Sequence, residues 1–89
     1  MNNESYRKVM GELLRKFRES RGISRDHVAK IGEMPIHQVS EVESGETNYT
    51  MDTFISYVRG CDLYMYFAEK DPDRLLEHDF ADLIKKAKK

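Results

Sequence analysis

The sequence predicts a small, mostly α-helical protein, with a core of four helices followed by one short β-strand and a C-terminal helix. Two observations lead to this prediction. Apolar side chains recur three and four residues apart along most of the chain, which is the spacing of one buried helix face. Glycine, proline and helix-capping residues divide the chain into short segments. The 89 residues form a single compact domain, with the helical core in residues 1–62 and an extension in residues 63–89.

The first helix is predicted from one apolar stripe, and the second from its cap. The stripe is expected to face the core and consists of Tyr6, Val9, Met10, Leu13, Leu14 and Phe17. Gly22 suits a left-handed end to this helix. Ser24 is the expected cap of the second helix, because its hydroxyl can accept from a free backbone N–H. The second helix ends at Gly32-Glu33, and its expected inward residues are Val28, Ala29 and Ile31.

The third and fourth helices are predicted from proline, glycine and threonine residues that mark where a helix starts or ends. Pro35 lacks an N–H, so it belongs in the first turn of the third helix. That helix buries Val39 and Val42 and ends at Ser44-Gly45. Thr50 caps a fourth helix that runs to about Cys61, with Phe54, Tyr57, Val58 and Cys61 inward.

The extension changes character. Residues 63–68 are apolar and aromatic, which favours a strand over a helix. Asp71-Pro72-Asp73 is typical of a turn. A final helix is then expected, with one apolar stripe formed by Leu76, Phe80, Leu83, Ile84 and Ala87.

The formal net charge of −1 conceals an uneven distribution. Residues 1–30 carry eight basic and four acidic side chains, whereas residues 31–60 carry one basic and five acidic side chains. The basic half is compatible with phosphate contacts, but the acidic middle argues against tight non-specific binding to nucleic acid.

Several classes of protein are not expected. No apolar run is long enough to cross a membrane, and the N-terminus lacks the pattern of a signal peptide. Cys61 is the only cysteine, so we expect no internal disulfide, a reducing cytoplasm, and a buried thiol. The histidines are not at ligand spacings with cysteine and the glycines are scattered. We therefore expect no metal, no cofactor and no enzymatic activity.

One set of residues follows a fixed spacing between positions 18 and 58. It comprises Arg18, Gly22-Ile23-Ser24-Arg25, Ala29, Val39-Ser40, Val42-Glu43, Gly45, Thr53-Phe54 and Tyr57-Val58. This pattern resembles the phage-repressor (Cro-like, XRE) family over roughly residues 10–63. The resemblance implies a lambda-repressor-like helix-turn-helix fold and a transcriptional regulator that binds double-stranded operator DNA as a homodimer. It also implies a partly buried ion pair between Arg18 and Glu43.

The sequence departs from the family pattern at three positions. Glu33 stands where the turn usually has a glycine, and Pro35 replaces the usual serine or threonine cap. Arg25 replaces the usual glutamine, and an arginine at this position can still clamp a phosphate.

The resemblance also implies which residues meet DNA. The expected base-reading face is Ile36, His37, Gln38, Ser40, Glu41 and Ser44. Gln38 could pair with adenine, and Glu41 could accept from a cytosine amine although it repels phosphates. Arg25 is the expected phosphate clamp, and the loop residues expected along the sugar-phosphate backbone are Thr47, Asn48 and Tyr49.

A lone strand leaves its backbone N–H and C=O groups unpaired, so we expect residues 63–68 to pair with a second copy. The expected interface consists of Leu63, Tyr64, Met65, Tyr66, Phe67 and, from the C-terminal helix, Phe80. The alternative is that residues 63–68 extend the fourth helix or fold onto their own core. A second functional hypothesis is an antitoxin or adaptor that holds a protein partner such as a toxin. A third is a scaffold that no longer binds DNA.

Overall fold

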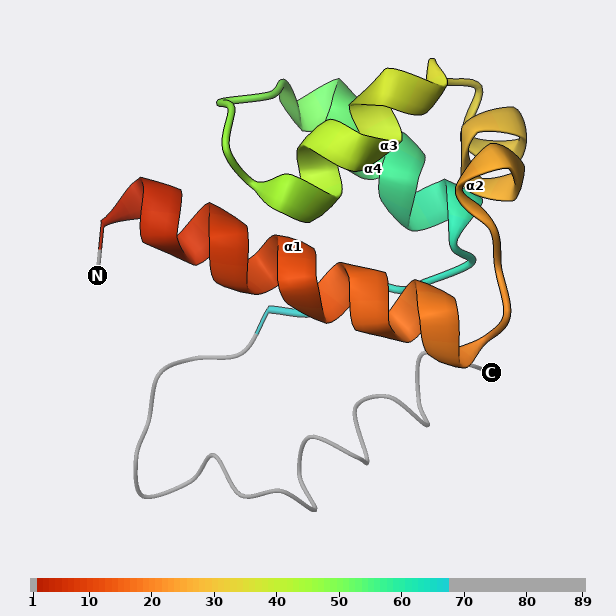
Figure 1. Cartoon of the computed structure of the whole chain (residues 1–89), viewed down its shortest axis with the longest axis horizontal. Coiled ribbons are helices and arrows are strands. Elements are labelled where there is room, and N and C mark those ends of the chain that lie inside the picture. Colours follow the sequence, from red (N-terminus) through yellow and green to blue (C-terminus); the bar gives the residue numbers. More distant parts are fainter. Residues whose placement is uncertain (1, 68–89) are drawn as a thin grey trace.

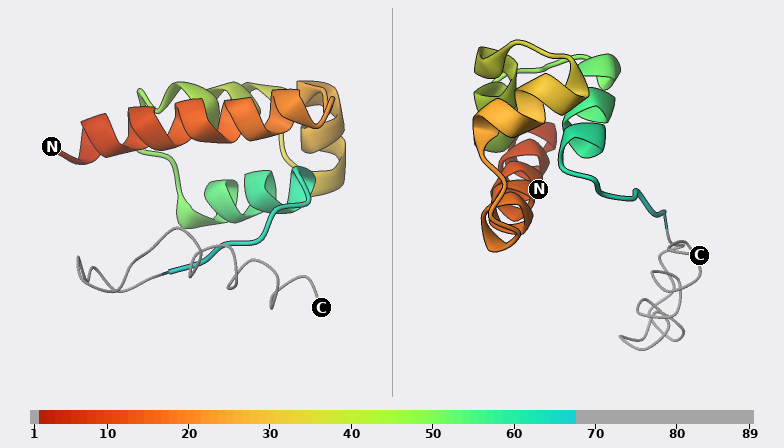
Figure 2. Two further views of the ribbon diagram at one scale, coloured as in Figure 1. Left: turned by 90° about the horizontal axis from the view of Figure 1, so that it is seen from below. Right: turned by 90° about the vertical axis from the view of Figure 1, so that its right-hand side faces the viewer.

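The computed structural model describes residues 2–67 and confirms a mostly helical fold in this range. The helices are α1 (Asn3–Ser20), α2 (Arg25–Gly32), α3 (Ile36–Ser44) and α4 (Met51–Gly60). The long α1 packs on α3, while α2 packs on α3 and α4 (Figure 1). Helix α2 lies at one end of the domain, beside the C-terminal ends of α1 and α4 (Figure 2).

Helix starts follow capping chemistry. Ser24 accepts from the His27 backbone N–H, and Thr50 accepts from that of Thr53, as expected for the starts of α2 and α4. Asn2 caps α1 in the same way. Pro35 is the N-cap residue of α3 rather than part of its first turn, and no side chain caps this end. The prediction therefore placed Pro35 one position too far into the helix, because its extended ψ of 144° still belongs to the preceding turn.

The core lies where α1, α2, α3 and α4 meet. Its buried cluster consists of Leu14, Val28, Met34, Val39, Val42, Tyr57 and Cys61. Val58 is also buried, and Phe54 is half-buried against this cluster. Cys61 is a free, fully buried cysteine, and burial raises the pKa of its thiol. The cysteine therefore packs as a small, protonated apolar side chain.

The predicted inward stripe of α1 is largely wrong. Leu14 is buried and Met10 is half-buried, but four other members of the stripe are exposed: Tyr6 (62%), Val9 (57%), Leu13 (52%) and Phe17 (46%). The reason is Gly11. It lies so close to α3 that a Cβ there would collide with the carbonyl oxygens of Val42 and Glu43. Close approach at this glycine sets the rotation of α1, and most of the apolar stripe is turned away from the core.

The same effect moves Ile31 outward, against the prediction. Gly32, like Val28, lies against α4, and a Cβ at Gly32 would collide with the Ser56 carbonyl oxygen. Ile31 stands about 100° away around the helix and is half exposed.

Residues 63–67 are extended but are not a β-strand, and no strand occurs anywhere in residues 2–67. They follow Asp62, which has a left-handed φ of 55°, and the chain reverses its direction after α4 (Figure 2, left). Leu63 packs against the core, whereas Tyr64, Met65 and Phe67 are exposed. A strand needs a ladder of backbone hydrogen bonds with a neighbouring strand, and no such ladder forms among residues 2–67. Ala68 and the expected C-terminal helix lie outside the described residues.

The turn between α2 and α3 keeps a left-handed conformation despite lacking the usual glycine. Glu33 has φ 54° and ψ 51°, and its N–H returns to the Lys30 carbonyl at 3.3 Å. An L-residue in this conformation costs roughly 1–2 kcal/mol because its Cβ approaches backbone oxygen. Glu33 thus holds strain that a glycine would not.

We expect Glu33→Gly to raise the free energy of unfolding by about 0.5 kcal/mol. Relief of the strain, roughly 1–2 kcal/mol, exceeds the roughly 0.4–1 kcal/mol that glycine adds to the entropy of the unfolded chain. Urea denaturation measures the change. Glu46→Gly is the matched control, because Glu46 is exposed and is not among the residues with positive φ. That control is expected to lose stability, and an equal loss in Glu33→Gly would contradict the strain.

Candidate nucleic-acid interface

Helices α2 and α3 are joined by a three-residue turn, residues 33–35, and α3 presents one face to solvent. Val39, Val42 and Glu43 form its buried face. At 100° per residue, five of the six remaining side chains share an arc of about 140° on the opposite side. They are Ile36, His37, Ser40, Glu41 and Ser44, and all but the half-buried Glu41 are exposed.

Gln38 does not share this arc. It is half-buried and stands about 160° around α3 from Ser40. A groove that receives the exposed arc would therefore meet Gln38 only at its edge.

The carboxylate of Glu43 joins all four helices. It accepts from Arg18 of α1 (Nε at 2.6 Å and the amino group at 3.2 Å), from Arg25 of α2 (Nε at 3.2 Å), and from the Tyr57 hydroxyl of α4 at 2.5 Å. The structure thus brings Arg18 and Glu43 together as expected, with each side chain at least nine-tenths buried. Arg18 also donates to the Ile23 carbonyl at 2.9 Å, which fixes the chain between α1 and α2.

Tyr57 and Arg25 were not expected in this network. Tyr57 was predicted only as a core residue, and a signal was available. A tyrosine rather than a phenylalanine at a fully buried position needs a partner for its hydroxyl. No comparable signal identified Arg25 as a partner of Glu43, because its family position indicated a phosphate contact.

Protonation follows from these contacts. Burial alone raises the pKa of the Glu43 carboxyl, but hydrogen bonds from Arg18, Tyr57 and Arg25 outweigh it and lower the net pKa. Burial and the bond to Glu43 raise the pKa of the Tyr57 hydroxyl. At neutral pH the pair is therefore a carboxylate accepting from a protonated phenol.

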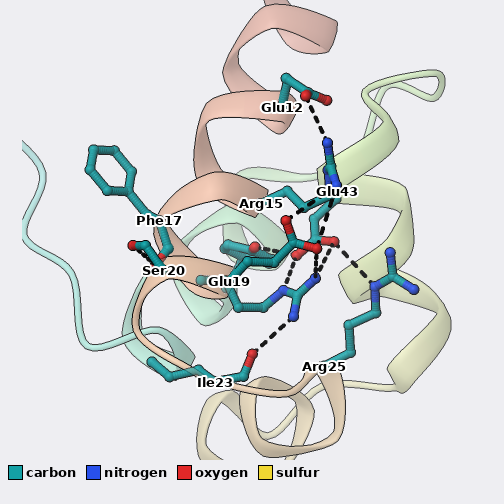
Figure 3. Close-up of polar contacts among 10 residues, drawn as sticks. Glu12, Arg15, Phe17, Glu19, Ser20, Ile23, Arg25 and Glu43 are labelled. Atoms are coloured by element: carbon teal, nitrogen blue, oxygen red, sulfur yellow. Dashed lines mark hydrogen bonds and ion pairs between the residues drawn. The ribbon is translucent and has the colours of Figure 1, made fainter.

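Arg25 is held on one side and open on the other. Its Nε–H binds Glu43, while its terminal amino groups point away from that carboxylate (Figure 3). Half of its side chain is exposed. These amino groups remain available to an external anion.

The loop after α3 differs from the expectation at one residue. Thr47 and Asn48 are exposed. Tyr49 instead turns inward and stacks on Phe54, with ring centroids 6.4 Å apart. Its hydroxyl is buried without a hydrogen-bond partner among residues 2–67, and burial raises the pKa of that hydroxyl. Tyr49 cannot reach a phosphate in this conformation, because its ring is stacked on Phe54 and its hydroxyl is buried.

Most basic side chains in the first half of the chain are already engaged. Arg15 pairs with Glu12 and Glu19, and Lys8 pairs with Glu4. Arg7 and Arg21 donate to carbonyl oxygens at the ends of other helices. Of the lysine and arginine side chains in residues 2–30, only those of Lys16 and Lys30 form no ion pair or hydrogen bond with a described residue. The basic side chains of the first half of the chain therefore do not form a surface of unpaired positive charge.

No family model matches the chain, and comparison with curated proteins finds no significant similarity. In the described part of the chain, no helix has both the length and the apolar character needed to cross a bilayer. The same residues contain no group of three potential metal ligands.

Proposed function

We propose that the protein is a transcriptional regulator that binds double-stranded DNA, with α2, the turn and α3 forming a helix-turn-helix and α3 lying in the major groove. The observation that carries the proposal is the solvent-facing arc of α3. It projects the apolar side chain of Ile36 and four polar or charged side chains from a helix whose other face is fixed by Val39, Val42 and Glu43. The major groove accommodates one α-helix, and side chains on such an arc can meet base edges.

Three further features support phosphate contact beside this arc. The N-terminus of α3 has no side-chain cap, so the positive end of its dipole is not satisfied by a side chain, although the Gln38 N–H donates to the Pro35 carbonyl at 3.0 Å. Arg25 stands at the start of α2 with its amino groups directed to solvent. The exposed Thr47 and Asn48 provide short polar side chains on the other flank.

The test is fluorescence anisotropy with DNA from upstream of the protein's own gene and with random DNA, at two salt concentrations. We expect His37→Ala to lower the preference for cognate DNA by on the order of 1 kcal/mol, and Gln38→Ala to lower it less. Arg25→Ala should weaken binding to both DNAs alike and reduce the salt slope by about one phosphate. Glu41→Gln should strengthen binding to random DNA, because a repulsive charge is removed.

Lys16→Ala is the matched control for Arg25→Ala. It removes one exposed positive charge from the polar flank of α1, and its effect should be small. Equal effects of His37→Ala and Arg25→Ala on cognate and random DNA would contradict the assigned roles. Absence of any salt-dependent binding would contradict the proposal itself.

The proposal includes a homodimer in which residues 63–68 pair with the same segment of a second copy. The exposed Tyr64, Met65 and Phe67 belong to an extended segment without strand pairing among the described residues. Pairing around a two-fold axis would close this edge. A suitable two-fold would also separate two α3 helices by about 34 Å, one turn of DNA.

We expect sedimentation velocity at tens of micromolar to give a dimer for the wild type and for Met65→Ala. Met65→Pro should give a monomer, because proline removes the backbone N–H that a ladder needs. The alanine variant controls for loss of the side chain. A monomeric wild type, or a dimeric proline variant, would contradict strand pairing.

A second candidate function is a protein-interaction module, such as an antitoxin or an adaptor. It is favoured by the electrostatics of the same surface, where Glu41 is on the proposed reading arc and few basic side chains are unpaired. Phosphate neutralisation dominates non-specific DNA affinity. A protein that binds neither cognate nor random DNA but still forms a complex with the product of an adjacent gene would fit this function instead.

A further inference from the structure

The outer surface of α1 is apolar, and no described helix covers it. Helices α3 and α4 lie on one side of α1 (Figure 1), and α1 packs on α3 alone among the described helices. On the uncovered side, an exposed stripe is formed by Tyr6, Val9, Leu13 and Phe17. At 100° per residue these four lie within an arc of about 80°, so they form one continuous surface.

A groove continues this surface toward α4. Its volume is about 480 Å³, and one wall is Met10, the neighbour of the stripe on α1. The other walls include Phe54 of α4 and Met65 and Phe67 of the extended segment. Phe67 is 93% exposed and is the last residue that the structure describes. The chain therefore leaves the described domain beside the apolar surface.

The remaining chain has a sequence that matches this surface. Leu76, Phe80, Leu83, Ile84 and Ala87 recur at helical spacing. From Leu76 to Ala87 a helix rises about 16 Å, and from Tyr6 to Phe17 the stripe also extends about 16 Å. Residues 68–75 connect the two and can span up to about 26 Å when extended.

We propose that residues 76–87 of the same chain form a helix that packs on the Tyr6–Val9–Leu13–Phe17 stripe of α1. Tethering favours this occupant over a second copy. A segment attached through a short connection has an effective concentration in the millimolar range, whereas a second copy is present at micromolar concentration. The C-terminal segment then adds a fifth helix to the domain, on a surface distinct from the solvent-facing arc of α3. This inference does not depend on the proposed function.

The full-length chain provides a direct test, because it contains no tryptophan. In a Phe80→Trp variant, we expect emission at the short wavelength of a buried indole, unchanged on dilution. Adding Leu13→Glu should shift the emission to that of an exposed indole, since a carboxylate would enter the contact. Adding Lys16→Glu, an exposed position on the polar flank of α1, should leave the emission unchanged. Far-UV circular dichroism confirms that both variants keep the helical core.

Each other result overturns the proposal. Exposed emission in Phe80→Trp alone means that residues 76–87 do not pack. If the emission stays that of a buried indole after Leu13→Glu is added, residues 76–87 pack elsewhere, for example on residues 63–67. As a second measurement, oxidation of a Leu13→Cys, Leu83→Cys double variant should form a disulfide within one chain. A cross-linked dimer in place of that product assigns the stripe to a second copy.

Discussion

Glu43→Ala is expected to lower the free energy of unfolding by on the order of 3–5 kcal/mol. Removing the carboxylate leaves the buried Arg18 guanidinium with only the exposed Glu19 carboxylate, 4.0 Å away, as a counter-charge, and losing the buried partner is the costly way to break such an ion pair. It also leaves the Tyr57 hydroxyl, at a fully buried position, without its acceptor. A loss of this size is a large fraction of the stability of a domain of 89 residues.

Thermal and urea denaturation measure the loss, and three variants locate its source. Glu41→Ala is the matched control, because it removes a half-buried glutamate from the same helix without breaking an ion pair. Arg25→Ala should cost only about 0–1 kcal/mol, since its side chain is half exposed. Tyr57→Phe should cost about 1 kcal/mol, the net value of one hydrogen bond. If Glu43→Ala unfolds at the same temperature as the wild type, the carboxylate does not hold the helices together.

The contribution of Glu43 should also depend on pH. The pKa of its carboxyl is lowered in the folded protein relative to 4.5, so folding favours the charged form. Its stabilisation is therefore fully present above the unfolded pKa and is lost as the pH falls through the folded one. The stability difference between the wild type and Glu43→Gln should be constant near neutral pH. It should become smaller in acid, as the pH falls below the pKa of Glu43 in the unfolded chain. A difference that stays constant into strong acid would contradict the lowered pKa.

The second large effect concerns Gly45, and Gly22 is its natural control. Both have left-handed φ values, 66° and 69°. A Cβ at Gly22 would meet nothing within 4 Å, whereas at Gly45 it would lie 2.5 Å from the Arg7 carbonyl carbon and 2.6 Å from the Lys8 nitrogen. Gly22→Ala should therefore cost only the backbone strain, roughly 1–2 kcal/mol.

Gly45→Ala adds a collision with the backbone of α1, for which overpacking typically costs about 1–3 kcal/mol. We expect a total loss of about 2–5 kcal/mol, measured by urea denaturation against Gly22→Ala. The shift of α1 should also lengthen the bond from Arg7 Nε to the Gly45 carbonyl, now 3.2 Å. Equal losses in the two variants would show that α1 moves aside without cost.

The helix limits were predictable because local chemistry determines them. Ser24, Thr50 and Gly45 cap or end helices through their own hydroxyl groups or backbone freedom, independent of distant residues. The rotation of α1 was not predictable from its apolar pattern. The stripe is wider than the face that contacts α3, and Gly11 decides which part of it turns inward.

The candidate site shows the same division. The resemblance identified Arg18 and Glu43 as an ion pair, because the pattern assigns both residues to defined positions along the chain. The inward turn of Tyr49 depends on Phe54, and the position of Gln38 depends on which face α3 buries. Such contacts depend on how the helices pack against one another, so the residues near Tyr49 or Gln38 in the sequence do not predict them.

The shared carboxylate of Glu43 has a consequence for how the domain unfolds. Its three donor residues come from three different helices, so no pair of helices can bury it with all of its hydrogen bonds made. A partly folded form that kept α3 packed on α1 but released α4 would retain a buried charge with an incomplete shell of donors, which is unfavourable. We therefore expect the four helices to be lost together in one cooperative transition, with partly folded species strongly disfavoured.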